Sequence, residues 1–432
     1  MKTLLTSCNF NSKLTNILVE GEVISKIGNE NFQHDQQINI EGNLVLPGMI
    51  DLHTHVRDMN QSYKEDWLSA SRAALKGGVS TIFDMPNTNP PTTNLNNYLH
   101  KKEYAKKSLV NYGIYVGATP YNFHEVEILL EKEPNVAGIK IFLAASSSNE
   151  IITNHDLIKK FFELAKRFDK PVLAHCELQD AIKTQSLLYK GEEFNSVLYH
   201  NKIRNTGAAG KAVELVLSIA DKVKNKLLLL HISSAEEIDI IKKYKQNLDF
   251  PLYCEVTPHY LFIDESILQH IGNFGKVNPP LRTAADNDAL WRALDEGIID
   301  TIGSDHAPHA LEEKLKKYDQ APSGFPGLET TLPLLLNEAI NHHRISIEEI
   351  VKLTSSQPAE IMKIHKRGFI HEGYYADLTV IDPKISWTID AQKFASKAKY
   401  SPYNGMEVSG KVVFTMINGE INNPKGKEVT YD

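Results

Sequence analysis

Several features that are common in other protein classes are missing from this sequence of 432 residues. It contains three cysteines, Cys8, Cys176 and Cys254, without the paired spacing of a disulfide framework or a cysteine-based zinc site. No apolar run approaches the about 20 residues that a membrane span needs, and the first residues carry no sustained apolar stretch of the kind that signals export. These absences predict a cytoplasmic protein without a membrane partner.

The sequence also lacks a long basic run. Its net charge is -7 at pH 7, which argues against nucleic acid or an anionic membrane as the partner. The shares of hydrophobic (42%) and charged (23%) residues are ordinary for a globular enzyme. Because the chain exceeds the usual size of a single core, we expect one large barrel with a smaller domain.

The middle of the chain alternates short apolar segments with helical ones, which is typical of a parallel α/β sheet. Strands are predicted at residues 50–56, 81–85, 112–117, 138–143, 171–177, 227–233, 252–257 and 299–304. Eight such units predict a TIM-like (β/α)8 barrel, in which catalytic groups lie at the C-terminal strand ends. A doubly wound open sheet is the alternative, but no glycine-rich phosphate loop follows the first strand.

Both ends of the chain carry short apolar strand patterns separated by turn residues. Such patterns need a partner, since neither end is long enough to bury a core alone. We therefore predict that residues 1–45 and 372–432 combine into a small composite β-sandwich domain. Residues 46–371 would form the catalytic barrel.

The first predicted barrel strand ends in a segment that contains His53 and His55. Alternate residues of a strand point to one face, so both imidazoles can bind one metal ion, with Arg57 next on that face. An isolated His-x-His pair is more often structural. The metal interpretation therefore depends on the later strands.

Other residues suited to metal binding lie on the later strands. His175 and His231 are at the ends of the fifth and sixth, and Asp305, after the eighth, could bind a metal and accept a proton. Lys140 lies inside the apolar fourth strand, where burial would lower its pKa and let it take up carbon dioxide as a carbamate. The alternative is that Lys140 reaches solvent or pairs with a carboxylate.

Polar residues follow the second, seventh and eighth strands. Asn87 and Asn278 are amides held beside prolines, and His309 lies on the loop after Asp305. The orientation of His259 is left open by the sequence. The charged and Gly/Pro-rich residues 311–329 fit either a lid over the site or a solvated loop.

Together these groups predict a site for two metal ions. Neutral imidazoles and carboxylate-type oxygens suit zinc, with other divalent metals as alternatives. The predicted ligands are His53, His55 and Asp305 for one metal, His175 and His231 for the other, and carboxylated Lys140 with a hydroxide between them. Two metals that flank one water lower its pKa and polarise the carbonyl that it attacks.

In this order the motifs resemble those of the amidohydrolase superfamily and, within it, of the dihydroorotases. The matching segments are residues 51–57, 84–88, 138–142, 174–177, the strand of His231, 278–282 and 303–309. The resemblance spans about residues 45 to 330, and the split β domain of the family covers the rest. Lys140 is similar to the lysine of the members that use a bridging carbamate.

The resemblance implies the reversible closure of N-carbamoyl-L-aspartate to L-dihydroorotate, with Asp305 as general base and acid. It implies that Arg57, Asn87 and His309 bind the substrate carboxylate and that Asn278 holds the amide edge of the ring. The expected partners are this small molecule and further copies of the chain in a homo-oligomer. Association with a carbamoyltransferase is left open.

The sequence departs from the family pattern after Arg57, where Asp58-Met59-Asn60 stands in place of the usual Glu-Pro-Gly. This leaves the conformation of the first loop open. Hydantoinases, dihydropyrimidinases and allantoinases share the metal ligands, but their substrates lack the carboxylate, so Arg57 favours a dihydroorotase. A non-catalytic scaffold subunit is expected to lose ligands, whereas all six are present here.

Overall fold

The computed structural model of this chain describes residues 1–145, 151–422 and 424–432. Its centre is an eight-stranded parallel sheet whose strands follow one another in sequence order. These strands are β6 (Met49–Thr54), β7 (Val79–Asp84), β8 (Asn111–Gly117), β9 (Val136–Phe142), β10 (Val172–His175), β11 (Leu227–Leu229), β12 (Leu252–Val256) and β13 (Thr301–Ile302). All eight predicted strands are confirmed.

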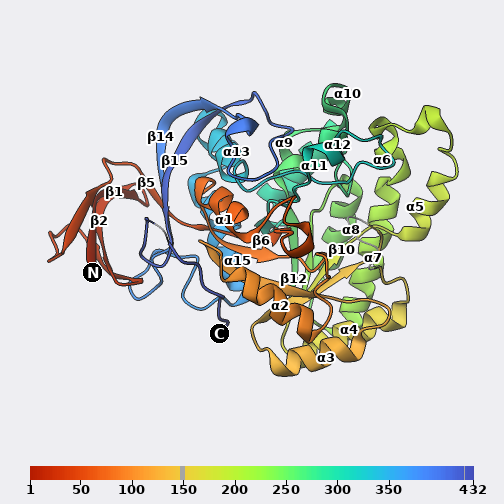
Figure 1. Cartoon of the computed structure of the whole chain (residues 1–432), viewed down its shortest axis with the longest axis horizontal. Coiled ribbons are helices and arrows are strands. Elements are labelled where there is room, and N and C mark those ends of the chain that lie inside the picture. Colours follow the sequence, from red (N-terminus) through yellow and green to blue (C-terminus); the bar gives the residue numbers. More distant parts are fainter. Residues whose placement is uncertain (146–150, 423) are drawn as a thin grey trace.

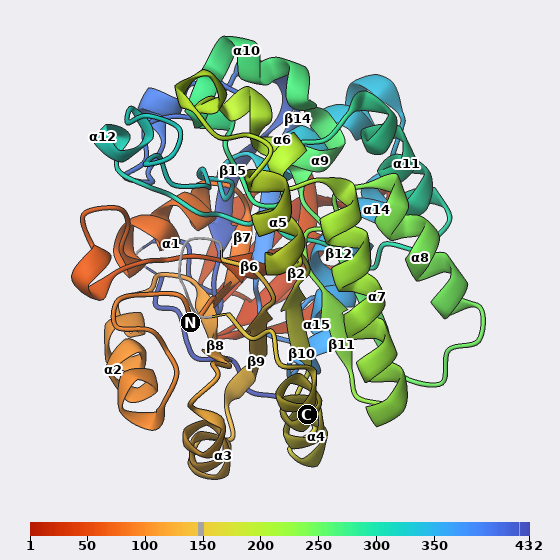
Figure 2. The same ribbon diagram turned by 90° about the vertical axis from the view of Figure 1, so that its right-hand side faces the viewer.

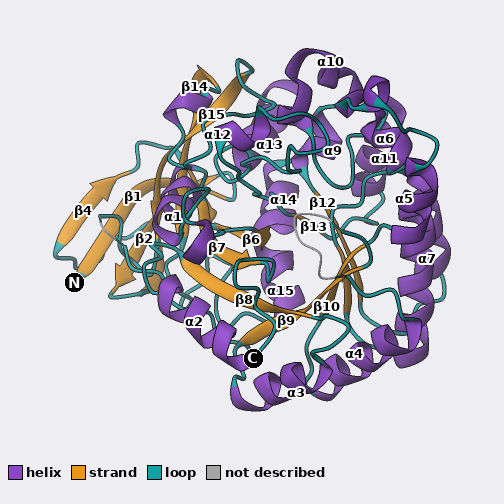
Figure 3. Cartoon of the chain, turned by 45° about the vertical axis from the view of Figure 1, so that its right-hand side comes forward, coloured by secondary structure: helices purple, strands orange, loops and turns teal. Residues whose placement is uncertain are grey.

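The sheet closes on itself next to its first strand. Thr54 forms a parallel bridge with His306, and the His55 amide donates to the His306 carbonyl at 2.7 Å. The segment after β13 therefore lies beside β6, and the predicted (β/α)8 barrel is confirmed. In Figure 3 the helices form a ring around these central strands.

The helices lie between and after the strands (Figure 2). They are α1 (Trp67–Lys76), α2 (Leu95–Ala105), α3 (Phe123–Lys132), α4 (His155–Arg167), α5 (Gln179–Ser186), α6 (His200–Ile203), α7 (Thr206–Val223), α8 (Ala235–Lys245), α9 (Pro258–Phe262), α10 (Leu268–Ile271), α11 (Ala284–Asp295), α12 (Leu311–Lys314), α13 (Thr331–Asn337), α14 (Ile347–Val351) and α15 (Gln357–Met362). Two π-helical segments, η6 (Glu338–His342) and η7 (Lys352–Ser356), extend α13 and join α14 to α15.

Alternate residues of the barrel strands pack on opposite sides of the sheet. In β7, Ile82 belongs to the large cluster between strands and helices, whereas Phe83 packs in the smaller interior cluster. That interior cluster also contains Ile361 of α15 and Val429 near the C-terminus. Apolar side chains therefore fill the barrel interior, and the polar groups gather at the C-terminal strand ends.

A second, mixed sheet combines strands from both ends of the chain, at the left of Figure 1. Its strands are β1 (Lys2–Phe10), β2 (Lys13–Glu20), β3 (Val23–Gly28), β4 (Gln36–Asn39), β5 (Leu44–Pro47), β14 (Leu378–Thr388) and β15 (Glu407–Met416). Antiparallel pairing of β14 with β5, with Leu378 opposite Pro47, joins the two ends. The division into domains at residues 45 and 372 stays a prediction.

The last residues of the chain leave the second sheet and return to the barrel. Glu428 forms a bridge with Tyr112 of β8, and Tyr431 forms one with Ile364 after α15. These contacts tie the C-terminus to the barrel. No helix among the described residues is both long and apolar enough to cross a membrane.

Candidate metal centre

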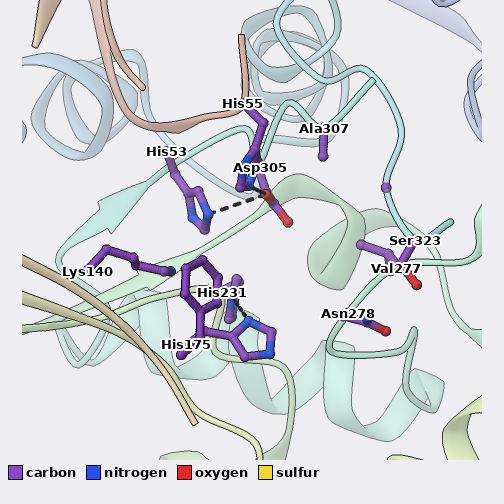
Figure 4. Close-up of a pocket in the computed structure, with 12 residues that line it drawn as sticks. His53, His55, Lys140, His175, His231, Val277, Asn278, Asp305, Ala307 and Ser323 are labelled. Atoms are coloured by element: carbon purple, nitrogen blue, oxygen red, sulfur yellow. Dashed lines mark hydrogen bonds and ion pairs between the residues drawn. The ribbon is translucent and has the colours of Figure 1, made fainter. Parts of the chain in front are cut away.

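Three predicted ligands meet where β6 approaches the segment after β13. Ligand atoms of His53, His55 and Asp305 all lie within 4.8 Å of one another, and the three residues are buried. The Nε2 atoms of His53 and His55 lie 3.3 and 3.1 Å from Asp305 Oδ1 (Figure 4). This part of the predicted site is therefore brought together by the barrel closure.

The tautomers of both histidines follow from their other neighbours. Nδ1 of His53 lies 2.7 Å from Glu255 Oε1, an oxygen that also accepts the backbone N–H of His231 at 3.2 Å. Nδ1 of His55 lies 2.7 Å from the amide oxygen of Asn87. Because both oxygens accept, each Nδ1 carries the proton and each Nε2 presents a lone pair. Two imidazole lone pairs and a carboxylate thus face one another, which suits a cation.

The second pair of histidines comes from the neighbouring strands β10 and β11. His175 Nδ1 lies 2.8 Å from His231 Nε2. The other ring nitrogen of His175 donates to Glu177, at 2.9 Å, and the two carboxylate oxygens of Glu177 share the Nε–H of Arg204, at 3.0 and 3.1 Å. Glu177 and Arg204 therefore fix the ring so that Nδ1 faces His231 with its lone pair, an arrangement common among metal-binding histidines.

Burial keeps these imidazoles neutral. The pKa of His53 falls to about 3, because burial in the barrel disfavours the charged ring. Burial lowers the pKa of His231 well below its usual value as well, and the neighbouring His175 adds to this shift. Neutral imidazole is the form that binds metals.

Lys140 is fully buried on β9, where Figure 4 shows its amine pointing toward the histidines. Its Nζ has no hydrogen-bond partner in the part of the chain that the structure describes, and it lies 4.7 Å from the centre of the Phe142 ring. Burial lowers the pKa of Lys140 to about 8. The alternatives of a solvated lysine and of a salt bridge within the described residues are therefore wrong.

Glu255 of β12 is a functional candidate that the sequence analysis did not assign. Its carboxyl group holds the His53 ring and the His231 backbone together, and burial raises its pKa to about 8. Gly303 leaves room for it, since a Cβ there would lie 2.4 Å from Glu255 Oε2. The feature of the sequence that could have indicated this role is the position of a glutamate within the otherwise largely apolar strand β12.

The predicted substrate-binding residues separate into two places. Asn278 lines the cavity, across from Lys140 in Figure 4. Arg57 and His309 lie in an adjacent buried cluster, where Arg57 Nη2 lies 3.2 Å from His309 Nε2. Asn87 contacts the His55 ring, so the structure adds a positioning contact that the sequence analysis did not expect.

Arg57 is a buried cation without an anionic partner among the described residues. It is 2% exposed, and burial lowers the pKa of its guanidinium. Glu313 pairs with the neighbouring Lys64, at 3.0 Å, whereas none of the described carboxylates lies within ion-pair distance of Arg57. An unpaired buried guanidinium is costly, so this cluster suits an incoming anion.

The loop at residues 311–329 is bound to the body of the barrel. Lys314 is buried and donates to the carbonyls of Lys276, Pro322 and Gly324, at 3.3, 2.9 and 3.0 Å. Ser323 and Gly324 of this loop line the cavity. Ser323 and Gly324 therefore form part of the cavity wall, whereas residues 311, 312, 315–317, 319 and 320 are exposed, as in a solvated loop.

His259 does not take part in the metal cluster. It is 1% exposed, its Nε2 lies 2.8 Å from the Thr257 hydroxyl, and it packs against Tyr260 and Phe325. The open question about this residue is thus answered in favour of a structural position.

A closed barrel with imidazoles, a carboxylate and a buried lysine at its C-terminal end defines the class of metal-dependent hydrolases. The chain belongs to the amidohydrolase family, whose model matches residues 44–422. The resemblance found in the motifs is thereby confirmed.

Two relatives and one solved structure illustrate this membership. A dihydroorotase of Methanosphaera stadtmanae is 34% identical over 99% of this chain and 98% of its own length. An L-hydantoinase of Paenarthrobacter aurescens is 33% identical over 90% of this chain and 86% of its own. The solved L-hydantoinase (dihydropyrimidinase) from Arthrobacter aurescens has a TM-score of 0.92 at 29% identity, covering 100% of this chain and 97% of that one.

Proposed function

We propose that this chain is a dihydroorotase, which interconverts L-dihydroorotate and N-carbamoyl-L-aspartate. The observation that carries the proposal is the buried Arg57 beside the candidate metal centre, which has no carboxylate within ion-pair distance among the described residues. Dihydroorotate bears a carboxylate that a guanidinium binds with two parallel hydrogen bonds. The dihydroorotases among the relatives support the same substrate.

The proposed cofactors are two Zn²⁺ ions, with Lys140 carboxylated. His53, His55 and Asp305 would hold one ion, and His175 and His231 the other. The donor set supports this proposal, since the histidine lone pairs converge and the buried Lys140 amine has no hydrogen-bond partner among the residues that the structure describes. Bound there, the metals acidify a water molecule and polarise the amide carbonyl.

Residues of the chain itself carry out proton transfer and substrate binding. Asp305 takes the proton from the attacking water and delivers it to the ring nitrogen as the amide bond breaks. Arg57 and His309 hold the substrate carboxylate, with Asn87 as a further donor. Asn278 holds the amide edge of the ring.

An L-hydantoinase activity is the second candidate, because one L-hydantoinase is among the relatives and the solved L-hydantoinase from Arthrobacter aurescens has a closely similar fold. The test is turnover of L-dihydroorotate, hydantoin and allantoin by the zinc-loaded protein. Turnover of dihydroorotate alone supports the proposal. Turnover of only hydantoin or allantoin would agree with the proposed hydrolysis of a cyclic amide but would contradict dihydroorotate as the substrate.

Arg57→Lys is expected to raise KM for L-dihydroorotate about tenfold or more with a smaller change in kcat. A lysine keeps the charge but cannot form the two parallel hydrogen bonds of a guanidinium. Steady-state kinetics measure the effect, and the exposed Arg72 of α1 provides the matched control, Arg72→Lys. An unchanged KM would place Arg57 outside the substrate site.

Glu177→Gln is expected to weaken metal binding at His175 and His231 by about 10- to 100-fold, the usual cost of losing such a supporting group. The amide loses the negative charge that holds both the His175 ring and Arg204. Competition with a chelator measures the affinity. Asp180→Asn, at an exposed carboxylate of α5, is the control, and equal affinities in both variants would contradict the role of Glu177.

Three finer expectations stay predictions. These are a homo-oligomeric state, an association with a carbamoyltransferase and a cytoplasmic location. Sedimentation of the purified chain, alone and with a carbamoyltransferase, measures the first two.

A further inference from the structure

His200 is a buried histidine that the proposed mechanism does not use. It begins α6, in the long connection between β10 and α7, and is 4% exposed. Its Nε2 lies 3.0 Å from the Val277 carbonyl and 2.8 Å from Asn278 Oδ1, while its Nδ1 lies 2.9 Å from the Tyr318 hydroxyl. A residue of the crossover thus contacts the one predicted substrate-binding residue that lines the cavity.

The tautomer of His200 follows from these contacts. The Val277 carbonyl can only accept, so Nε2 carries the proton and is shared between this oxygen and Asn278. Burial lowers the pKa of His200 to about 3, and the cationic Arg204 and Lys276 add to this shift, so the ring is neutral. Nδ1 is then bare and accepts a hydrogen bond from Tyr318.

This tautomer fixes the orientation of the Asn278 amide. An N–H group facing Asn278 at 2.8 Å requires the amide oxygen, because the opposite orientation would bring two donors together. Nδ2 of Asn278 is left without an acceptor among the described residues. Since Asn278 lines the cavity, its amide presents hydrogen-bond donors to the substrate.

We propose that His200 is a positioning residue that holds Asn278 with its N–H groups toward the cavity, so that the site selects a substrate with a carbonyl oxygen at this point. A free asparagine could instead turn its oxygen inward and accept a ring N–H. His200 removes that choice before the substrate arrives, which lowers the cost of ordering the amide on binding. This inference rests on the proposed cyclic amide substrate.

The test compares His200→Phe with His200→Gln. Phenylalanine fills the space without a donor, so KM is expected to rise about tenfold with kcat within about threefold. The side-chain amide of glutamine reaches the Nε2 position and is expected to restore KM to within about threefold of the wild-type value. Should His200→Phe not fold, His200→Asn takes its place, since its shorter amide cannot reach Asn278.

A double-mutant cycle separates positioning from packing. If His200 acts through Asn278, then His200→Phe adds no further rise in KM to Asn278→Ala. The proposal would be overturned if the rise in KM of the double variant equalled the product of the rises in the two single variants. An unchanged KM in His200→Phe would overturn it as well. Thermal unfolding and metal content are measured in each variant.

The cycle uses whichever cyclic amide the wild-type protein hydrolyses. If the wild-type protein turns over hydantoin but not dihydroorotate, the proposed function is overturned, and the double-mutant cycle can still be measured with hydantoin. An uncoupled cycle with active dihydroorotate turnover would overturn the role of His200 alone.

Discussion

Asp305→Asn is expected to lower kcat by about 10³-fold or more while the barrel stays folded. Asparagine has nearly the same shape but cannot accept the proton that the reaction must move to the leaving nitrogen. Asp305 has a positive φ of 44°, a backbone conformation that asparagine tolerates well. Stopped-flow or steady-state kinetics of L-dihydroorotate hydrolysis measure the effect.

Metal content decides how this loss is interpreted, since Asp305 is also a proposed ligand. The amide oxygen of asparagine keeps one donor atom, so elemental analysis is expected to find metal in the variant. The exposed Asp319, on the loop that walls the site, provides the control Asp319→Asn with wild-type kcat. Near-normal turnover in the metal-loaded Asp305 variant would remove its proton-transfer role.

Lys140→Met is expected to abolish turnover and to remove at least half of the bound metal. Methionine matches the length of the lysine chain but cannot take up carbon dioxide. In the metal-free protein the Lys140 amine is buried without a hydrogen-bond partner among the described residues, so there the apolar replacement is expected to leave the melting temperature unchanged or higher. Elemental analysis and native mass spectrometry provide the measurements, with the mass of one carbon dioxide lost in the variant.

Lys101 provides an informative contrast. It is as deeply buried as Lys140 but pairs with Asp84 at 2.6 Å, so Lys101→Met leaves a carboxylate unpaired and is expected to destabilise the fold. Full metal content and turnover in Lys140→Met would show that a carbamate is not needed.

The barrel and the convergence of the proposed ligands at one end of it were predictable because both depend on local patterns. Apolar runs alternating with helices define the strands, and a parallel barrel brings all C-terminal strand ends together. His175 and Asp305 could therefore be assigned to one site from two distant segments. The bounds of β1 within residues 1–45 did not follow from the sequence pattern, because a bulge between Leu5 and Cys8, with Ser7 at a φ of 55°, interrupts its alternation.

The supporting contacts could not be predicted in the same way. Glu255 lies 202 residues from His53, and His200 lies 78 residues from Asn278, so only the folded chain reveals these pairs. The contact of Asn87 with His55 could not be predicted from the sequence either, because it depends on how two loops meet.

The first loop shows how a departure from the family pattern is accommodated. Arg57, Asp58 and Met59 all have positive φ values, of 66°, 47° and 50°. The Asp58 carboxylate accepts hydrogen bonds from the backbone N–H groups of Met59 and Trp67, which stabilises this turn without proline or glycine. Arg57 is thus held in place at the start of the loop.

The most direct test of the proposed function compares L-dihydroorotate with dihydrouracil, which has the same ring without the carboxylate. With two zinc ions bound, kcat/KM is expected to favour dihydroorotate by about 10³-fold or more, because without the substrate carboxylate the buried Arg57 has no anion to pair with among the described residues. Equal values for the two rings, or a preference for dihydrouracil, would contradict the proposal that this chain is a dihydroorotase.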